Sequence, residues 1–344
     1  MIDTLAVVGA TGAVGRIIVE LLLERQFPAR RLKLLASARS AGRPFEVKGT
    51  SLEVEELTPD SFVGVDVAIG STPDEVAAEF VPWAVERGTV VVDESAFFRM
   101  RPDVPLVIPE VNAAALATHR GIIASPNCST TQMVMVMKPL HDAARVKRVI
   151  VSTYQAVSGA GLAATRELEQ ATTAWLGKEP EANQVFSHRI AANLIPQIGS
   201  PRPNGFTSEE MKMVLETRKI LGDESIAISA TCVRVPVANG HSESILIETE
   251  KKLTADEARK LLAGFPGIVV EDDLAAKRYP QPRTASGHDE VFVGRIREDI
   301  SCPNGIALWC VSDNLRKGAA TNAVQIAEYL AKHGLKGAGH SGRS

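Results

Sequence analysis

The stretch Leu5-Ala6-Val7-Val8-Gly9-Ala10-Thr11-Gly12-Ala13-Val14-Gly15 decides the fold of the first part of the chain. Its apolar run predicts a strand and its glycines a tight turn. The segment that follows, Val14–Arg25, is expected to be a helix because its apolar residues recur on one helical face. Glycines let a backbone approach a pyrophosphate closely, and a helix N-terminus offers it free N–H groups. The stretch therefore indicates a dinucleotide site; the alternative is a strand-to-helix turn without a ligand.

The same alternation continues through the first third of the chain. Strands are expected at Leu5–Val8, Leu32–Ala36, Val65–Ile69 and Val90–Val92, and helices at Val14–Arg25 and Asp74–Arg87. Strands that alternate with helices form a parallel sheet covered by helices. The sequence thus predicts an α/β fold with an N-terminal, doubly wound Rossmann-type nucleotide-binding domain over residues 1–127.

The pattern changes beyond residue 128 to long alternating segments, which are typical of a mainly antiparallel sheet with one covered face. They lie at Val146–Ala156, Ile226–Val237, Ser242–Glu250, Val291–Arg297 and Ile306–Val311, with helices expected at about 161–176, 208–221 and 254–263. This favours a C-terminal α+β domain over residues 128–313. Arg316–Leu330 is expected to be helical, and the Gly/Ser/basic tail, 334–344, to be disordered.

Composition excludes several classes of protein. The chain has 344 residues, 45% of them hydrophobic and 23% charged, with a net charge of −3 and no dense basic run. This is the profile of a soluble globular protein and argues against nucleic acid as a partner. No apolar stretch reaches membrane-spanning length, and the N-terminus lacks the basic region of a signal peptide. The four cysteines lack metal-type spacing, so no metal is expected; two disulfides are conceivable, but a reducing, cytoplasmic location is favoured.

A candidate cofactor determinant follows the second predicted strand, in Leu35-Ala36-Ser37-Ala38-Arg39-Ser40. NAD enzymes usually place an acidic residue there to bind the ribose 2′-hydroxyl. This chain instead has Arg39 flanked by the hydroxyls of Ser37 and Ser40, which suits a 2′-phosphate. A solvated loop arginine is the alternative. The sequence therefore favours NADP over NAD.

Cys128 is the candidate nucleophile. It stands in Ser125-Pro126-Asn127-Cys128-Ser129-Thr130-Thr131, where a predicted strand ends and a helix begins. A cysteine at a helix N-terminus has its thiolate stabilised by the helix dipole and by free N–H groups. Beside a nicotinamide site, such a cysteine suggests chemistry at the acyl level through a covalent thio-adduct. The alternative is a buried structural cysteine, which suits Cys232, Cys302 and Cys310.

Three polar residues interrupt or end predicted strands. Gln155 precedes the glycine loop Ala156–Gly161 and suits the wall of a site. Arg234 points opposite to its valine neighbours, so it lines the other surface if they face a core. His241 begins the next strand after a short turn, which in an antiparallel hairpin would bring it near Arg234. A structural histidine is the alternative.

Three further charges are ambiguous from their spacing. Thr207 and Glu210 form a capping-box pattern, which places Glu209 and Lys212 on one helical face, where an exposed ion pair is the simpler interpretation. Arg99, in Phe97-Phe98-Arg99, is a loop cation after a strand and could bind an anion or nothing.

These segments together resemble the aspartate-semialdehyde dehydrogenase family over nearly the whole chain. Several separate motifs in one order are more specific than any one of them. The motifs are Gly9–Gly15, Asn127–Thr130, Gln155–Gly159, Glu209–Met213, Arg234–Val237, Gly240–Ser244, Val291–Arg297 and Ser312–Ala320. The family often has asparagine where this chain has Ser125.

The resemblance implies roles for the candidate residues. Cys128 would form the acyl-thioester, His241 would be the acid/base catalyst, and Gln155 would assist. Substrate contacts would come from Arg234, Glu209, Gln155 and Asn127, and phosphate contacts from Arg99 and Lys212. NADP contacts would come from Gly9, Thr11, Gly12, Ala13, Val14, Ser37, Arg39, Ser40, Ser158, Gly159 and Asn314. A C-terminal helix, 314–332, would complete the NADP domain, and residues 128–313 would carry catalysis and dimerisation in a homodimer.

The reaction implied is the reversible NADPH-dependent reduction of aspartyl phosphate to aspartate semialdehyde, in the biosynthesis of lysine and diaminopimelate, methionine and threonine. N-acetyl-glutamyl-phosphate reductase is the nearer alternative, because it runs the same class of reaction on a longer acyl phosphate. A non-catalytic paralogue is the other alternative. Such a chain should lack the cysteine, histidine or arginine, and all three are present in this one.

Overall fold

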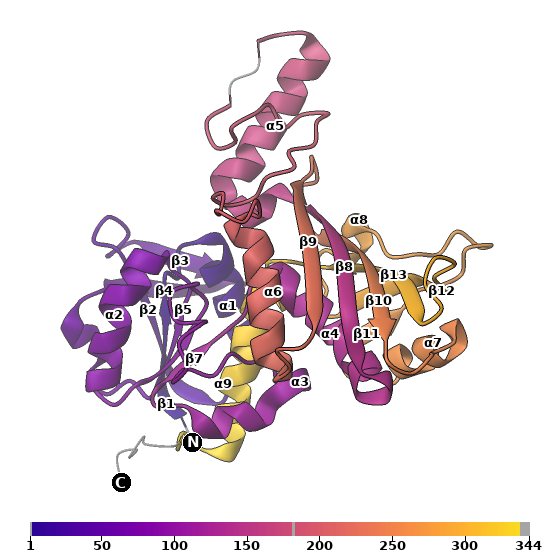
Figure 1. Cartoon of the computed structure of the whole chain (residues 1–344). Helices are drawn as coiled ribbons and strands as arrows, with labels where there is room; N and C mark the ends of the chain where they lie inside the picture. Colours follow the sequence, from indigo (N-terminus) through magenta and orange to yellow (C-terminus); the bar gives the residue numbers. More distant parts are fainter. Residues whose placement is uncertain (1, 181–182, 338–344) are drawn as a thin grey trace. The chain divides into compact units, whose positions relative to one another are not determined.

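The computed structural model describes residues 2–180 and 183–337 (Figure 1). The chain forms two compact units, Met1–Asn127 with Ala319–Ser344, and Cys128–Gly318. The first boundary falls where the sequence pattern changes. The chain re-enters the first unit at Ala319. The C-terminal segment was expected to rejoin this unit from residue 314, which is too early because 314–318 belong to the second unit.

The first unit contains a seven-stranded sheet of order β3-β4-β2-β1-β5-β6-β7. Its neighbours pair in parallel except for β3 and β4, an antiparallel hairpin that the sequence pattern did not predict. The strands are β1 (Ile2–Val8), β2 (Ala29–Ala36), β3 (Pro44–Val47), β4 (Thr50–Glu56), β5 (Val67–Gly70), β6 (Val90–Asp93) and β7 (Ile122–Ala124). Because β1 has β2 on one side and β5 on the other, strand order reverses at β1, where such sheets bind ligands.

Helices cover this sheet and close its core. They are α1 (Ala13–Glu24), α2 (Asp74–Glu86), α3 (Pro109–Asn112) and α9 (Thr321–His333), with short 3-10 turns η1 (Pro59–Phe62) and η2 (Ala113–Thr118). Apolar residues of α1 and α9 share one buried cluster with β1 and β5, so the C-terminal helix is part of this unit's core.

The C-terminal tail is only partly described. Residues 338–344 of the tail that was expected to be disordered lie outside the described residues. Leu335 packs against the core of the first unit, and Gly337 lies against His119. The expectation of disorder is therefore wrong for 334–337.

The second unit contains a six-stranded sheet of order β11-β12-β13-β10-β8-β9. The central pairs are antiparallel, whereas β8 with β9 and β11 with β12 are parallel, so the sheet is mixed. The strands are β8 (Val146–Gln155), β9 (Ala227–Arg234), β10 (His241–Thr249), β11 (Ile268–Val270), β12 (Val291–Glu298) and β13 (Gly305–Ser312). Each long strand alternates buried and more exposed residues, as expected for a sheet covered on one face.

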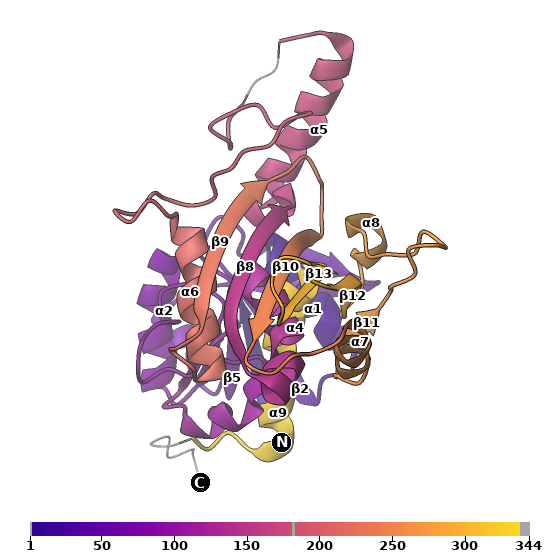
Figure 2. The same cartoon turned by 45° about the vertical axis from the view of Figure 1, so that its right-hand side comes forward.

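Helices α4, α6 and α7 pack on the covered face of this sheet (Figure 2). Helix α5 extends away from the strands in both views. The helical elements are α4 (Cys128–Ala144), α5 (Leu162–Gly177), α6 (Ser208–Leu221), α7 (Ala255–Ala263), α8 (Pro282–Ala285), the 3-10 turn η3 (Val157–Ala160) and the π turn η4 (Arg316–Ala320), in which the unit ends. Among the described residues no helix has the length and apolar character needed to cross a membrane.

The strands β9 and β10 do not form the hairpin expected from the sequence. They are consecutive in the chain, but β8 lies between them in the sheet. Strand β9 runs parallel to β8 and ends beside its last residue, while β10 runs antiparallel to β8 and begins there. Arg234 and His241 still lie at the same end of the sheet. They do so because β9 and β10 both pair with β8, and not because a hairpin turn joins them.

Candidate active site

A row of polar side chains crosses the covered face of the second sheet at one end. Gln155 ends β8 and pairs with Arg234, the last residue of β9. Tyr154 pairs with Ser242, which places His241, the first residue of β10, beside Gln155 on the other side. All three row members are buried, at 1% exposed for Gln155, 6% for Arg234 and 0% for His241. Buried polar side chains in such a row need partners or a ligand.

One backbone residue orients both the histidine and the arginine. The Ala156 N–H donates to Nδ1 of His241 at 3.0 Å, and the Ala156 carbonyl accepts from Nη1 of Arg234 at 2.6 Å. Since Nδ1 accepts this hydrogen bond, the neutral ring carries its hydrogen on Nε2. Among the described residues Nε2 has no hydrogen-bond partner. The ring therefore presents one unused N–H donor.

His241 does not titrate near neutrality, as a proton-exchanging histidine was expected to do. Burial, with Arg234 as a lesser cause, lowers the pKa of His241 to about 3. A cation beside an already desolvated imidazole disfavours a second positive charge. His241 is therefore neutral across the physiological range.

Glycine at position 159 leaves room in front of this pair. A Cβ atom there would lie 3.1 Å from Nη1 of Arg234 and 3.1 Å from both Cε1 and Nε2 of His241. The guanidinium of Arg234 also lies 6.0 Å from the ring centroid of Phe186, within the range of a cation–π contact. Any side chain at 159 would crowd the space that Arg234 and His241 share.

Glu209 and Lys212 form an ion pair at the start of α6, with Nζ of Lys212 3.1 Å from Oε2 of Glu209. The side chain of Glu209 is only 9% exposed, so the exposed-pair interpretation is wrong for this carboxylate. Its other oxygen accepts from Nε2 of Gln155 at 3.3 Å. The capping box predicted at Thr207 and Glu210 is present and fixes this first turn.

Cys128 is the first residue of α4 and is partly accessible. Its charge acts on Arg234, which places the sulfur near the polar row. A Cβ atom at Gly318 would lie 2.8 Å from Cβ of Cys128, so only glycine fits beside the cysteine. By contrast, burial raises the pKa of Cys232 and of Cys310, and both remain thiols.

The glycine turn of the first unit has the close approaches that a dinucleotide turn requires. Gly9 has a φ of +80°, and a Cβ atom there would lie 2.2 Å from the carbonyl oxygen of Ser71. At Gly15 it would lie 2.1 Å from the carbonyl oxygen of Gly9, so α1 packs directly on the end of β1. The turn from Gly9 through Thr11 and Gly12 to Ala13 and Val14 thus has the backbone that the sequence predicted, and it fits a pyrophosphate.

The loop after β2 lies at the same edge of the first sheet, because β2 pairs in register with β1 up to Leu35 and Val8. Ser37 and Arg39 are exposed, and the Ser40 N–H donates to the Ser37 carbonyl at 2.8 Å. The structure gives no side-chain hydrogen bond or ion pair to Arg39 within the described ranges, so its guanidinium can bind a ligand.

Other predicted residues have structural contacts. In the first unit, Arg99 is 7% exposed and donates from Nε to the Ser125 carbonyl at 2.9 Å and from Nη2 to the Glu94 carbonyl at 2.7 Å. Burial raises the pKa of Glu94 to about 8, although Arg99 lowers it. In the second unit, Nδ2 of Asn314 donates to Oγ of Ser158 at 3.0 Å. Asn127 belongs to the first unit, and so do Arg99 and the glycine turn.

The strongest signal that the sequence interpretation missed lies one step along the same strands. Thr153 donates to Oε1 of Gln155 at 3.0 Å and so orients its amide. Glu243, which pairs with Thr153, is likewise buried on the covered face, and Ser312 extends the first row beside His241; both are 0% exposed. Polar residues two apart at the end of otherwise apolar strands could have revealed this second row.

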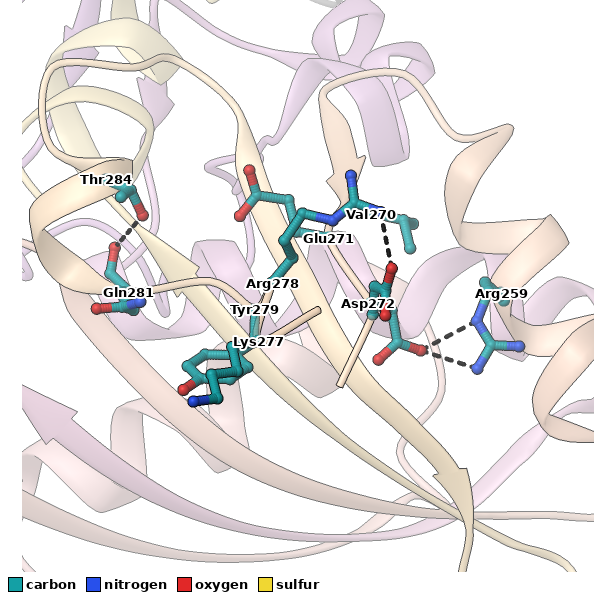
Figure 3. A pocket seen from close by; sticks show the side chains of 10 residues that line it. Arg259, Val270, Glu271, Asp272, Lys277, Arg278, Tyr279, Gln281 and Thr284 are labelled. Atoms are coloured by element: carbon teal, nitrogen blue, oxygen red, sulfur yellow. Dashed lines mark hydrogen bonds and ion pairs between the residues drawn. The ribbon is translucent and has the colours of Figure 1, made fainter. Parts of the chain in front are cut away.

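A separate pocket of 530 Å³ lies in the second unit between β11, α7 and α8 (Figure 3). Its charges largely pair with one another, as Arg259 does with Asp272 at 2.8 Å and Arg278 with Asp273 at 2.9 Å. None of the predicted site residues lines it. The lining residues are Arg259, Val270, Glu271, Asp272, Asp273, Lys277, Arg278, Tyr279, Gln281 and Thr284.

Comparison with known proteins agrees with both units. The family model described as semialdehyde dehydrogenase, NAD binding domain, matches residues 4–119, and the one described as semialdehyde dehydrogenase, dimerisation domain, matches residues 137–317. The fold and site thus define a semialdehyde dehydrogenase, a class of oxidoreductase.

Similar proteins of known identity show which semialdehyde dehydrogenase family the chain belongs to. Aspartate-semialdehyde dehydrogenase of Aquifex aeolicus is 52% identical over 96% of this chain and 98% of its own. The crystal structure of aspartate semialdehyde dehydrogenase II from Vibrio cholerae complexed with ASA is 46% identical, with a TM-score of 0.94 over 96% of this chain and 99% of its own. The structure of the Candida albicans enzyme with NADP is 27% identical, with a TM-score of 0.74 over 96% and 99%. The chain belongs to the aspartate-semialdehyde dehydrogenase family.

Proposed function

We propose that the protein catalyses the reversible, NADPH-dependent reductive dephosphorylation of L-aspartyl 4-phosphate to L-aspartate 4-semialdehyde. The observation that supports this most directly is the row of Arg234, Gln155 and His241 beside Glu209. Arg234 offers a guanidinium for the α-carboxylate and Glu209 a carboxylate for the amino group. The Vibrio cholerae relative, which was crystallised with ASA, supports the same substrate class.

Cys128 acts as the nucleophile in this proposal. Its thiolate attacks the acyl carbon of aspartyl phosphate, the C–O bond to phosphate breaks, and a thioester remains on the sulfur. NADPH, when bound, supplies the hydride that reduces this acyl group. The resulting alkoxide on Cys128 collapses to the aldehyde and returns the thiolate, and the phosphate that left takes its proton from solvent. Gln155, which Thr153 and Glu209 orient, would hold the acyl group, together with Asn127.

His241 stabilises the negative oxygen of this adduct. Because its Nδ1 accepts from Ala156, Nε2–H is the donor that faces the space beside Gly159. Its low pKa keeps the ring neutral at physiological pH, so the Nε2–H donor is present there. A preorganised donor aimed at a developing oxyanion needs no proton exchange of its own.

The proposed cofactor is NADP. The turn residues Gly9, Thr11, Gly12, Ala13 and Val14 would bind the pyrophosphate, and Arg39 with Ser37 and Ser40 the 2′-phosphate. Ser158, Gly159 and Asn314 are proposed to complete the site. The Candida albicans relative, solved with NADP, supports this choice.

We predict that Arg39→Ala weakens NADP binding by about 10- to 100-fold and leaves NAD binding nearly unchanged. Losing one charge-assisted hydrogen bond costs about 1.5–3 kcal/mol, and NAD has no 2′-phosphate to lose it from. Titration calorimetry with each cofactor measures both constants. Arg31→Ala, at the other end of β2, is the matched control and should bind both normally. Equal losses for the two cofactors would refute the assignment.

Lys212 and Arg99 are proposed to bind the phosphate that leaves or enters. We predict that Lys212→Ala raises the KM for phosphate about tenfold, as loss of a hydrogen bond to a charged group does, with the KM for NADP unchanged. Lys219→Ala, later in the same helix, serves as the control. If the KM for phosphate is unchanged in this variant, Lys212 does not bind phosphate and is only the ion-pair partner of Glu209.

We propose a homodimer built through the exposed face of the second sheet. The match to a dimerisation domain supports this, and so do the apolar residues on that face. Ile150 is 41% exposed at its centre, and the rings of Tyr154 and Trp309 lie tilted to each other with centroids 5.4 Å apart. We predict a dimer mass by light scattering, and half that mass for Ile150→Lys, which buries a charge at the interface. A monomeric wild type, or a variant that stays dimeric, contradicts this.

The assay that tests the function compares two aldehydes. With aspartate semialdehyde, phosphate and NADP, NADPH should form, and it should not form when phosphate is omitted. Preference for N-acetyl-glutamate semialdehyde would favour the other acyl-phosphate reductase, and inactivity with both would favour a non-catalytic paralogue. We also propose that the enzyme is cytoplasmic and that its product enters the biosynthesis of lysine and diaminopimelate, methionine and threonine.

A further inference from the structure

Glu243 is a buried carboxyl group for which the proposed mechanism has no use. It follows His241 by two residues on β10, so both side chains face the covered side of the sheet. Glu243 is 0% exposed, and both of its oxygens are without a hydrogen-bond partner among the described residues. Burial raises its pKa well above the usual value, which favours the protonated, neutral form.

Gln132 lies next to this acid. It stands four residues after Cys128 on α4, so both side chains share one helical face. Its Oε1 accepts from Oγ of Ser312 on β13 at 2.6 Å, while Nε2 has no hydrogen-bond partner in the described parts of the chain. The Gln132 amide is close enough to Glu243 to act on its pKa, although the two do not have hydrogen-bond geometry. The Gln132 amide therefore lies between β13 and β10.

The other titratable groups around Glu243 are thiols. Cys310 pairs with it across β13, and Thr153 pairs with it across β8. Burial raises the pKa of Cys310 and of Cys232, so both remain thiols. Glu209 and Glu210, on α6, act on Cys232 from the other side. No cation pairs with Glu243 in the described residues, so ionising it would leave a buried, uncompensated charge.

We propose that Glu243 is a positioning residue: with Gln132 and Ser312 it forms a buried polar bracket that holds the start of α4, and with it Cys128, against the strand that begins with His241. The unused Nε2 donor of Gln132 and the unused oxygens of Glu243 are complementary, which a leucine side chain at position 243 would not be. The bracket spans α4, β10 and β13, the elements that bring nucleophile and oxyanion donor together. A small misplacement of a reacting group is costly to turnover.

The first test compares Glu243→Gln with Glu243→Leu. The glutamine variant keeps a neutral polar side chain and should keep kcat within about twofold, whereas leucine should lower kcat about 10- to 100-fold with little change in the KM for substrate. Ile245→Ala, on the same face of β10, is the control for lost packing and should lower Tm without lowering kcat. Normal kcat in Glu243→Leu, or an equal loss in Glu243→Gln, overturns the proposal.

Two readouts keep the inference apart from the proposed function on which it rests. The first readout is the rate at which iodoacetamide alkylates Cys128. This rate should differ from that of the wild type in Glu243→Leu and Ser312→Ala but not in Glu243→Gln, and it does not depend on which substrate the enzyme uses. The second readout is the free energy of unfolding as a function of pH. Because burial raises the pKa of Glu243, the folded state keeps a proton that the unfolded chain loses above the ordinary glutamate pKa of 4.5. Wild type should therefore lose unfolding free energy relative to Glu243→Gln as pH rises from about 5 to 8. Unaltered alkylation in both bracket variants, or parallel stability curves, contradicts the proposal even if the enzyme acts on another aldehyde.

Discussion

Cys128→Ala will lower kcat by more than about 10⁴-fold while leaving the fold intact. Removing a nucleophile leaves only binding and electrostatic stabilisation, as in other covalent enzymes. Alanine removes one sulfur atom at the start of α4, beside Gly318, where the cysteine is partly accessible, so little packing is lost. Steady-state NADPH formation measures the loss, and circular dichroism checks the fold. The second unit should keep its Tm within a few degrees.

Labelling identifies the reactive cysteine independently. One equivalent of iodoacetamide should modify Cys128, and substrate should slow the reaction. Cys302→Ala is the matched control, since this cysteine is also partly accessible but lies in a turn beside β13. If label appears on Cys302 or Cys232 and the Cys128 variant keeps most of its activity, the thioester mechanism is wrong.

His241→Ala should lower kcat by about 10²–10³-fold, the usual effect of removing one oxyanion donor. Substrate binding should change less, because Arg234 and Glu209 remain. His241→Gln distinguishes donation from proton exchange. A glutamine amide can donate a hydrogen bond but cannot shuttle a proton, so it should recover part of the lost turnover. Equal losses in both variants would favour proton exchange, and a loss below about tenfold would make His241 structural.

The pH profiles of the wild type and the His241→Gln variant give the same distinction. The quantity kcat/KM reports ionisations of the free enzyme. Because burial and Arg234 lower the pKa of His241 to about 3, protonation of the ring should begin only near that value. No limb that His241→Gln abolishes should therefore appear between pH 5 and 8. A limb near 6.5 that disappears in this variant would contradict the neutral-donor role.

Much of the fold was predictable because its elements follow local periodicity. The turn from Gly9 to Gly15 and the strands and helices around it depend on residues close in sequence. The hairpin β3–β4 was missed because its strands, Pro44–Val47 and Thr50–Glu56, are polar and half exposed. Strand order could not be deduced from adjacency, so β9 and β10 were expected to pair although β8 separates them.

The site was predictable in part, for a related reason. Cys128 and the glycine turn carry local signals, whereas Gln155, Arg234 and His241 acquire meaning only when β8 aligns them. The low pKa of His241 could not be predicted from the sequence, because it depends on burial and on a cation from another strand. The same holds for Glu243, whose environment comes from α4 and β13.

The most direct test of the central claim is the mass of the enzyme mixed with aspartyl phosphate in the absence of NADPH. The account predicts one aspartyl group per chain, located on Cys128 by peptide mapping, together with one phosphate released per chain. Adding NADPH should remove the group and yield one equivalent of aspartate semialdehyde. An unmodified enzyme that still reduces aspartyl phosphate, or an acyl group on another residue, would contradict the account.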